Sequence, residues 1–218
     1  MSFVAATRGA ASEPRGRLED YRDDGPLARF LGGALENVPV SAAALTLLAA
    51  LPLAAMLLSG GARGSAAALG ATTAWAILAG GVASGRPHSG RFAWLVSPVL
   101  RALEYGSLLG FAVLAGPSAV PLSFALVAVL TFHHYDTVYR LRHQGVAPPA
   151  WLSLAGGGWD GRILVGYLLL VTGTLRPGFI VLAVVLGVTY LVESIVSWAR
   201  FSQPQRPSPY ADEEDEDE

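Results

Sequence analysis

Long apolar runs separated by short polar segments cover most of the chain. A helix needs about 20 predominantly apolar residues to cross the hydrocarbon core of a bilayer, and the runs approach this length, with the fifth the shortest. The pattern predicts an all-α polytopic membrane domain at residues 37–200 with six transmembrane helices. The six predicted spans are Pro39–Leu58, Ser65–Ala83, Phe92–Leu114, Val120–Tyr139, Trp159–Leu175 and Gly178–Ala199.

The composition agrees with a membrane protein. Only 15% of the 218 residues are charged and 52% are hydrophobic, whereas a soluble domain carries about 25% charged residues. Thirteen of the 17 acidic residues lie before residue 37 or after residue 211. The absence of cysteine excludes disulfides and thiolate metal sites.

Arginine placement predicts the orientation, because all 15 basic residues are arginine. Twelve of them fall in the N-terminal segment, the second-to-third loop, the fourth-to-fifth loop and the C-terminal tail. Only Arg63 and Arg176 fall in the loops on the other side. Positively charged loops face the cytoplasm. We therefore expect a multi-pass protein of the cell (inner or plasma) membrane with both termini cytoplasmic.

The two ends of the chain differ from the apolar domain. Residues 1–15 are expected to be a disordered N-terminus, and residues 201–218 a disordered acidic tail, because a block of like charges repels itself. Residues 16–36 mix Leu18, Tyr21 and other apolar side chains with arginine and aspartate. This mixture predicts an interfacial amphipathic helix, with a disordered arm as the alternative.

Ionisable groups within the spans gather on the cytoplasmic side. At 1.5 Å per residue, Arg101 lies about 14 Å and Glu104 about 18 Å below the entry of their span. Intramembrane charges face a bundle interior or a water-filled cavity, so we expect a polar cavity open to the cytoplasm. Arg101 and Glu104 are three residues apart. They either neutralise each other as a structural pair, or Arg101 binds a phosphate and Glu104 orients it.

The stretch 131-TFHHYDTVYRLRH-143 holds the first group of catalytic candidates. His133, Asp136 and Arg140 follow at i, i+3 and i+7, which is one stripe of a helix. His133 or His134 could act as a general base, and Asp136 is the acidic group beside them. An interfacial belt explains the tyrosines and arginines of this stretch, but it does not explain Asp136 and the paired histidines.

The stretch 154-LAGGGWDGR-162 holds the second group. Asp160 either caps the helix that follows or joins the catalytic and metal-binding residues. A glycine loop at a helix N-terminus also suits a phosphate. The candidate catalytic residues are thus His133, His134, Asp136 and Asp160. The candidate phosphate ligands are Arg86, Arg101, Arg140 and Arg162. The expected cofactor is Mg²⁺ or Mn²⁺, held by Asp136, Asp160 and Glu104.

Six spans, an interfacial N-terminal helix and a cytoplasm-facing cavity resemble the CDP-alcohol phosphotransferases. The matching region is 80-GGVASGRPHSGRFAWLVSPVLRALE-104, in which Gly85-Arg86 stands for the Ala-Arg pair of that family's signature. The resemblance implies transfer of a phosphoalcohol from a CDP-activated donor, with two divalent metals held by aspartates. No aspartate occurs in residues 80–104, so those ligands do not carry over.

A closer resemblance covers about residues 15–200. It is to an uncharacterised actinobacterial membrane domain family, with members fused behind CDP-alcohol phosphotransferase modules. The segments F-H-H-Y-D-x-x-Y-R at 132–140 and G-G-W-D-G-R at 157–162 carry this likeness. It implies a sister or degenerate relative of the phosphotransferases, with its polar residues relocated to Asp136, Asp160 and their neighbours.

Two functions therefore compete. The first is an enzyme of phospholipid or polar head-group metabolism that binds a phosphate- or CDP-bearing substrate. The second is a non-catalytic membrane anchor or regulatory subunit for a partner enzyme. A small transporter ranks below both, because the two halves of the chain show no repeat. The expected partners are membrane lipid and either a second copy or a membrane enzyme, and no nucleic acid. Convergence of Asp136 and Asp160 with His133, His134 or Glu104 would favour the enzyme.

Overall fold

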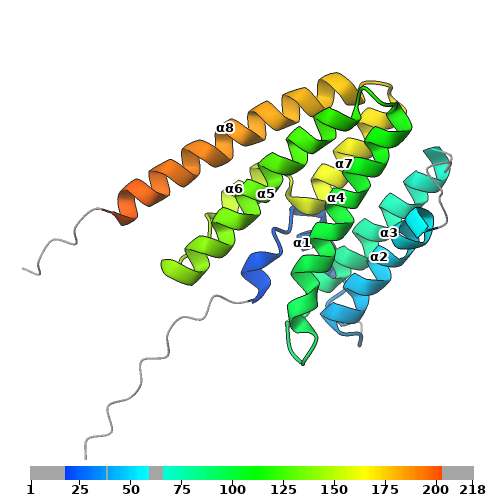
Figure 1. Ribbon diagram of the computed structural model, residues 1–218. Coiled ribbons are helices and arrows are strands. Elements are labelled where there is room, and N and C mark those ends of the chain that lie inside the picture. The colour runs from blue at the N-terminus through cyan, green and yellow to red at the C-terminus, as the bar shows by residue number, and fades with distance from the viewer. Residues whose placement is uncertain (1–17, 38, 59–65, 203–218) are drawn as a thin grey trace, which may run out of the picture.

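The computed structural model describes residues 18–37, 39–58 and 66–202, and the regular structure in these ranges is entirely helical (Figure 1). The all-α fold class is confirmed. The expected disordered N-terminus at residues 1–15 and nearly all of the expected acidic tail lie outside the described residues. The elements are η1 (Leu18–Tyr21), α1 (Pro26–Ala34), α2 (Ala42–Leu58), α3 (Ala66–Ser84), η2 (Ala93–Leu95), α4 (Val96–Ala115), α5 (Val120–His143), α6 (Ala150–Ala155), α7 (Gly158–Val171) and α8 (Leu175–Phe201).

A helix occupies each of the six ranges predicted as spans. Three helical segments, namely α3, Ala93–Ala115 and α8, are long and apolar enough to cross a membrane. The 14 residues of α7 extend about 21 Å, less than the roughly 30 Å of a hydrocarbon core. Helix α5 is longer but ends in a charged segment that contains Asp136 and Arg140. Length and composition thus support three crossings, and the six-span count stays a prediction.

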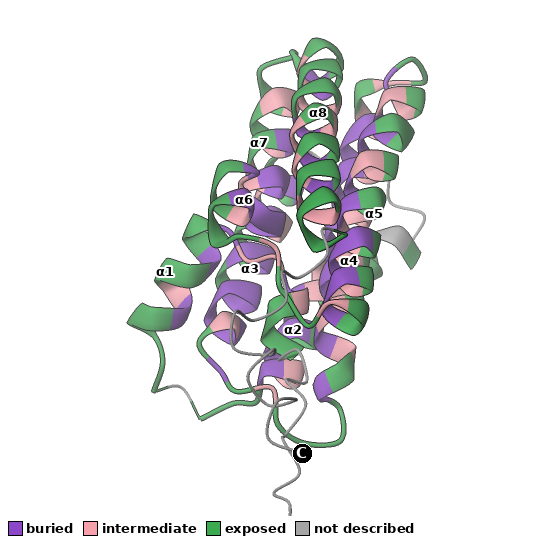
Figure 2. Ribbon diagram, turned by 90° about the vertical axis from the view of Figure 1, so that its left-hand side faces the viewer, coloured by how far each residue is buried: buried purple, intermediate pink, exposed green. Residues whose placement is uncertain are grey.

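Apolar side chains cover the outside of the bundle, most clearly on α8. Val181, Val184, Val185, Val188 and Val192 are each more than half exposed along this helix (Figure 2). Several arginine and acidic side chains are buried instead. A continuous apolar surface of this kind is unfavourable in water and is the surface that lipid covers. The distribution indicates a membrane protein.

Helix α7 lies at the centre of the packing and contacts α1, α3, α4 and α8. Trp159, near its start, is fully buried. Its ring lies against Gly80 of α3, where an added Cβ would come within 2.7 Å of a ring carbon. Helix α5 packs along α8 and also contacts α4. These contacts bring the starts of α4 and α7 close to the charged end of α5.

Helix α1 is shorter than the amphipathic helix predicted at residues 16–36, and it packs on the bundle. Ala28 and Gly32 are buried, and α1 contacts α3 extensively. The hydroxyl of Ser84 on α3 donates a hydrogen bond to the Ala28 carbonyl at 2.6 Å. Phe30 is 71% exposed, so an apolar side chain remains available to a membrane surface. The interfacial location itself stays a prediction.

Candidate functional site: a polar pocket at the charged end of the bundle

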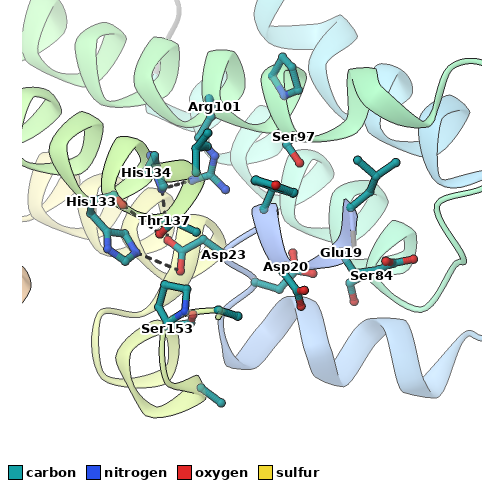
Figure 3. A pocket seen from close by; sticks show the side chains of 18 of the residues that line it. Glu19, Asp20, Asp23, Ser84, Ser97, Arg101, His133, His134, Thr137 and Ser153 are labelled. Atoms are coloured by element: carbon teal, nitrogen blue, oxygen red, sulfur yellow. Dashed lines mark hydrogen bonds and ion pairs between the residues drawn. The ribbon is translucent and has the colours of Figure 1, made fainter. Parts of the chain in front are cut away.

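A pocket of about 780 Å³ lies where η1 and the start of α1 meet α6, the first turns of α4 and the last turns of α5. Figure 3 shows Asp23, Arg101, His133 and His134 gathered on one side of it. Four acidic and three basic residues line the pocket, which leaves one net negative charge if the histidines are neutral. The ionisable lining residues are Glu19, Asp20, Asp23, Asp24, Arg29, Arg101, His133, His134 and Arg142.

The two adjacent histidines of α5 are held by different neighbours. His133 is buried, and its ring stacks on Tyr190 of α8 with centroids 4.0 Å apart. His134 Nδ1 lies 2.6 Å from the Tyr105 hydroxyl, and its Nε2 lies 2.5 Å from Arg101 Nη1. A guanidinium can only donate hydrogen bonds. Nε2 is therefore the accepting nitrogen of His134, and Nδ1–H donates to Tyr105.

Asp23 reaches the histidines from the loop between η1 and α1. Its backbone has φ 55°, a left-handed conformation in which aspartate is enriched relative to most residues. Arg162 Nη2 donates to its Oδ2 at 2.6 Å, and His134 Nε2 lies 3.3 Å from the same oxygen. Oδ1 lies 3.7 Å from His133 Nε2. Among the described residues this buried oxygen has no hydrogen-bond partner.

The charge of Asp23 is fixed by its neighbours. Burial by itself would raise its pKa, because it disfavours the charged form. The charge of Arg162 outweighs burial and holds the pKa of Asp23 well below its usual range. Asp23 is therefore ionised at neutral pH, so the unpartnered Oδ1 belongs to a carboxylate.

A buried ion-pair chain runs beneath the pocket. Glu104 is 0% exposed, and it accepts a hydrogen bond from Arg101 Nη1 at 2.7 Å and from Arg162 Nε at 2.6 Å. Arg162 also donates to the Tyr190 hydroxyl at 3.1 Å. The i,i+3 contact expected for Arg101 and Glu104 is thus present, but it is one link of a longer network. That network joins α4, α7 and α8 to the loop that carries Asp23.

Asp136 lies in a separate network between α5 and α8. Arg140 donates to it through Nε at 2.7 Å, and the Ser194 hydroxyl donates at 3.0 Å. Trp198 Nε1 donates at 3.2 Å, and Arg140 also binds Glu193. Both oxygens of Asp136 therefore have protein donors. The predicted stripe does lie on one face, but Asp136 and Arg140 bind α8 and do not line the pocket.

Asp160 caps α1, a neighbouring helix. One of its carboxylate oxygens accepts the backbone N–H of Gly25 at 2.7 Å, and the other accepts those of Leu27 and Ala28 at 3.0 and 3.1 Å. The N-cap of α7 is Gly157, which makes no side-chain cap hydrogen bond. The capping role suggested by the sequence is thus present at α1, a helix other than the one expected. The first N–H groups of α1 have no partner within their own helix, and Asp160 supplies one from α7.

The glycine loop before α7 packs closely against the backbone of the segment that leads into α1. Gly158 has φ 59°, and a Cβ there would lie 2.1 Å from the Gly25 nitrogen. The N–H of Trp159 donates to the Asp23 carbonyl at 3.1 Å. The start of α7, which the sequence suggested for phosphate, is thus occupied by the segment that leads into α1.

The structure does not bring the predicted metal ligands together. Asp136 is bound at the α5–α8 interface, Asp160 at the start of α1, and Glu104 between two arginines. Among the predicted phosphate ligands only Arg101 lines the pocket. Arg86 donates to the Leu35 carbonyl at the end of α1. Arg140 and Arg162 are committed to the two buried networks.

Sequence reasoning missed six ionisable pocket residues: Asp23, Arg29, Arg142, Glu19, Asp20 and Asp24. The sequence does contain a local signal at Asp23, because 23-DDGP-26 combines acidic residues with the Gly-Pro that begins α1. That signal marks a turn before a helix, but it does not say which side chains the turn will approach. Arg142 is exposed on the last turn of α5, where the sequence suggested an interface residue.

Comparison with known proteins leaves the chemistry open. No curated protein and no solved structure matches the chain. One family profile matches residues 12–214, which includes every described residue that lines the pocket. The chain therefore belongs to the family of unknown function DUF5941.

Proposed function

We propose that this chain is an integral membrane protein whose pocket binds a phosphate-bearing ligand. The observation that carries the proposal is the set of three guanidinium groups on the pocket wall. Arg29 comes from α1, Arg101 from α4 and Arg142 from α5. Arginine binds phosphate through two parallel charge-assisted hydrogen bonds. Three separate elements thus supply donors of the right chemistry to one cavity.

All three arginines have N–H groups that are not already hydrogen-bonded. Arg142 is exposed and has no hydrogen-bond or ion-pair partner among the described residues. The buried Nε of Arg101 also lacks a partner in the described part of the chain. Arg29 donates through Nε to the Asp24 carbonyl at 2.9 Å, and its other N–H groups remain. A phosphate can therefore bind without first breaking every existing contact.

The membrane arrangement proposed with this function is six crossings with both termini in the cytoplasm. The apolar face of α8 and the 12-to-2 distribution of loop arginines support it. The pocket would then open to the cytoplasm, where soluble phosphate compounds and lipid head groups can both reach it. The CDP-bearing substrate implied by the resemblance belongs to this ligand class. The catalytic roles of His133 and His134 stay a prediction.

Replacement of Arg142 by glutamine tests the pocket with little risk to the fold, because the side chain is exposed. We expect it to weaken binding of short-chain phosphatidic acid about tenfold, the effect of losing one charged hydrogen bond. The full chain in detergent would be titrated by calorimetry. Inorganic phosphate and CMP serve as further probes, so that a lipid phosphate can be told from a free one. Short-chain diacylglycerol is the phosphate-free control.

Arg176→Gln is the matched control variant. It makes the same charge change at an exposed position near the start of α8, outside the pocket lining. The proposal expects it to bind like the wild type. Equal weakening in both variants, or no binding of any phosphate probe to the wild type, would count against the pocket.

A non-catalytic anchor or regulatory subunit is the second candidate. The observation in its favour is that most predicted site residues are committed to helix packing: Asp136 and Arg140 to α8, Asp160 to α1, and Arg162 to Glu104. A homodimer or a membrane-enzyme partner is the expected association. Failure of all phosphate probes, together with stable co-purification of a membrane enzyme, would favour this candidate.

A further inference from the structure

Asp23, His133 and His134 place one carboxylate and two imidazoles around a common point (Figure 3). Donors that each lie about 2.0–2.2 Å from one ion are at most about 4.4 Å apart. The two nitrogen-to-carboxylate distances, 3.7 Å from His133 and 3.3 Å from His134, meet this limit. All three ligand atoms lie within 4.8 Å of one another. A shift of a few tenths of an ångström therefore brings them to coordination distance.

The carboxylate has an unused acceptor at this point. The side chain of Asp23 is only 8% exposed, and its Oδ1 is the oxygen that faces His133. That atom is buried and has no hydrogen-bond partner in the described ranges. A buried polar atom without a partner is unfavourable, because it has lost its hydration and gained no hydrogen bond. A cation at the centre of the three groups would supply the missing interaction.

Both imidazoles are held in place by neighbours, and His134 is oriented as metal-binding histidines usually are. Such ligands commonly use one nitrogen for the metal and donate a hydrogen bond from the other. His134 Nδ1 is held by the Tyr105 hydroxyl at 2.6 Å, which leaves Nε2 as the ligand atom. His133 is fixed by stacking on Tyr190, with an interplanar angle of 12°. Neither ring has to be turned over to present its nitrogen.

From this geometry we propose that Asp23, His133 and His134 bind one divalent transition-metal ion. Imidazole nitrogens suit zinc and the other late first-row metals, whereas Mg²⁺ prefers oxygen ligands. Three protein ligands leave a position for water or for a ligand atom from the pocket. The donor set differs from Asp136, Asp160 and Glu104, which the sequence suggested for Mg²⁺ or Mn²⁺.

Binding of the ion changes the role of Arg101. His134 Nε2 now accepts a hydrogen bond from Arg101 Nη1, and one lone pair cannot serve both partners. Coordination releases that N–H toward the pocket. The charges of Arg101 and Arg162 balance those of Glu104 and Asp23, so a divalent ion adds two positive charges to this cluster. An anion in the pocket offsets them, and we expect metal and phosphate to strengthen each other's binding.

The test measures metal binding directly on the full chain in detergent. The protein is stripped with a chelator, loaded separately with Zn²⁺, Mn²⁺ and Mg²⁺, and desalted. Bound metal is then counted by plasma mass spectrometry, and affinity is measured by calorimetry. We expect about one equivalent of Zn²⁺ per chain for a single three-ligand site. We expect Mg²⁺ to be lost on desalting.

Variants separate a site from adventitious binding. His133→Ala and Asp23→Asn each remove a ligand and should abolish stoichiometric Zn²⁺. Tyr105→Phe removes the hydrogen bond to His134, together with a contact to Thr131 that is no ligand, and should weaken affinity about tenfold. His143→Ala is the matched control, because it removes an exposed histidine from the same helix. Melting temperatures check that each variant is folded. If a variant that lacks a ligand does not fold, Tyr105→Phe still tests the site, because it leaves all three ligands in place.

The outcomes are separable from those for the phosphate pocket, because the metal site does not rest on that proposal. Stoichiometric Zn²⁺ that is lost in His133→Ala and kept in His143→Ala supports the site even if phosphate has no effect. Equal loss in both variants overturns the site, as does a stripped wild type that takes up no transition metal. If phosphate binds but no metal does, the proposed phosphate pocket stands and the proposed metal site is overturned.

Discussion

Asp160→Ala is expected to lower the free energy of unfolding by about 3 kcal/mol or more, because it strands three backbone donors. The N–H groups of Gly25, Leu27 and Ala28 bind this carboxylate at 2.7–3.1 Å. Asp160 itself is fully buried, so water cannot replace it at low cost. We also expect α1 to detach before the rest of the bundle melts. Denaturation in detergent, followed by circular dichroism, measures the total effect.

Two further variants make this prediction specific. Asp160→Asn keeps one acceptor oxygen and should lose roughly half as much stability as alanine, since one carbonyl can still satisfy part of the cap. Glu36→Ala removes an exposed acidic residue just after α1 and should change stability by less than about 0.5 kcal/mol. If Asp160→Ala were as mild as Glu36→Ala, the capping role would be untenable.

Arg162→Met is expected to cost about 3–5 kcal/mol, the range for breaking one partner of a buried ion pair. The substitution leaves Glu104 and Asp23 without the guanidinium that binds both at 2.6 Å. Glu104 is fully buried, so its charge cannot be hydrated without local opening. The same denaturation measurement applies, and the purified variant should also show a lower melting temperature.

A double variant tests the electrostatic cause. In Arg162→Met with Glu104→Gln, one stranded charge is neutralised while its volume is kept. We expect the pair to recover at least about 1 kcal/mol relative to the sum of the single effects, which is a usual coupling energy for contacting residues. Strictly additive losses would mean that Arg162 stabilises the bundle through its packing and not through these carboxylates.

The sequence predicted the helices well, because their signal is local. Apolar runs of about the right length mark α2, α3, α4, α5, α7 and α8, and each predicted range contains a helix. The number of helices that cross the membrane is harder to predict, for a physical reason. Tertiary contacts within the bundle can bury a short helix such as α7, so an apolar run alone does not fix how far a helix reaches through a membrane.

The site was harder to predict, because its contacts join distant parts of the chain. Asp160 meets α1 across 132 to 135 positions of sequence, whereas capping rules describe only a helix's own neighbours. Asp23 depends on a left-handed backbone and on Arg162, 139 positions away. His133 and Asp136 share the α8-facing stripe that the spacing indicated, but only His133 extends to the pocket.

From the sequence, convergence of Asp136 and Asp160 with a histidine or Glu104 is the expected sign of an enzyme. The structure meets this condition only in part. Asp136 and Asp160 point to different helix interfaces, which favours a structural role for both. His133 and His134 do converge with a carboxylate, but that carboxylate is Asp23. The polar centre of this lipid-facing bundle contains several buried charges, and such groups are costly and commonly mark a functional site. Ligand binding is therefore the function to test first, before a role as a membrane anchor.

The central claim is that the pocket binds a phosphate-bearing ligand, and cysteine protection tests it most directly. The chain contains no cysteine, so Ser97→Cys introduces a single thiol on the pocket wall. Ser202→Cys provides an exposed thiol just after α8, outside the pocket lining. Short-chain phosphatidic acid should slow alkylation of the first thiol at least about tenfold and leave the second unchanged, whereas equal alkylation rates with and without the probe at Ser97→Cys would contradict the account.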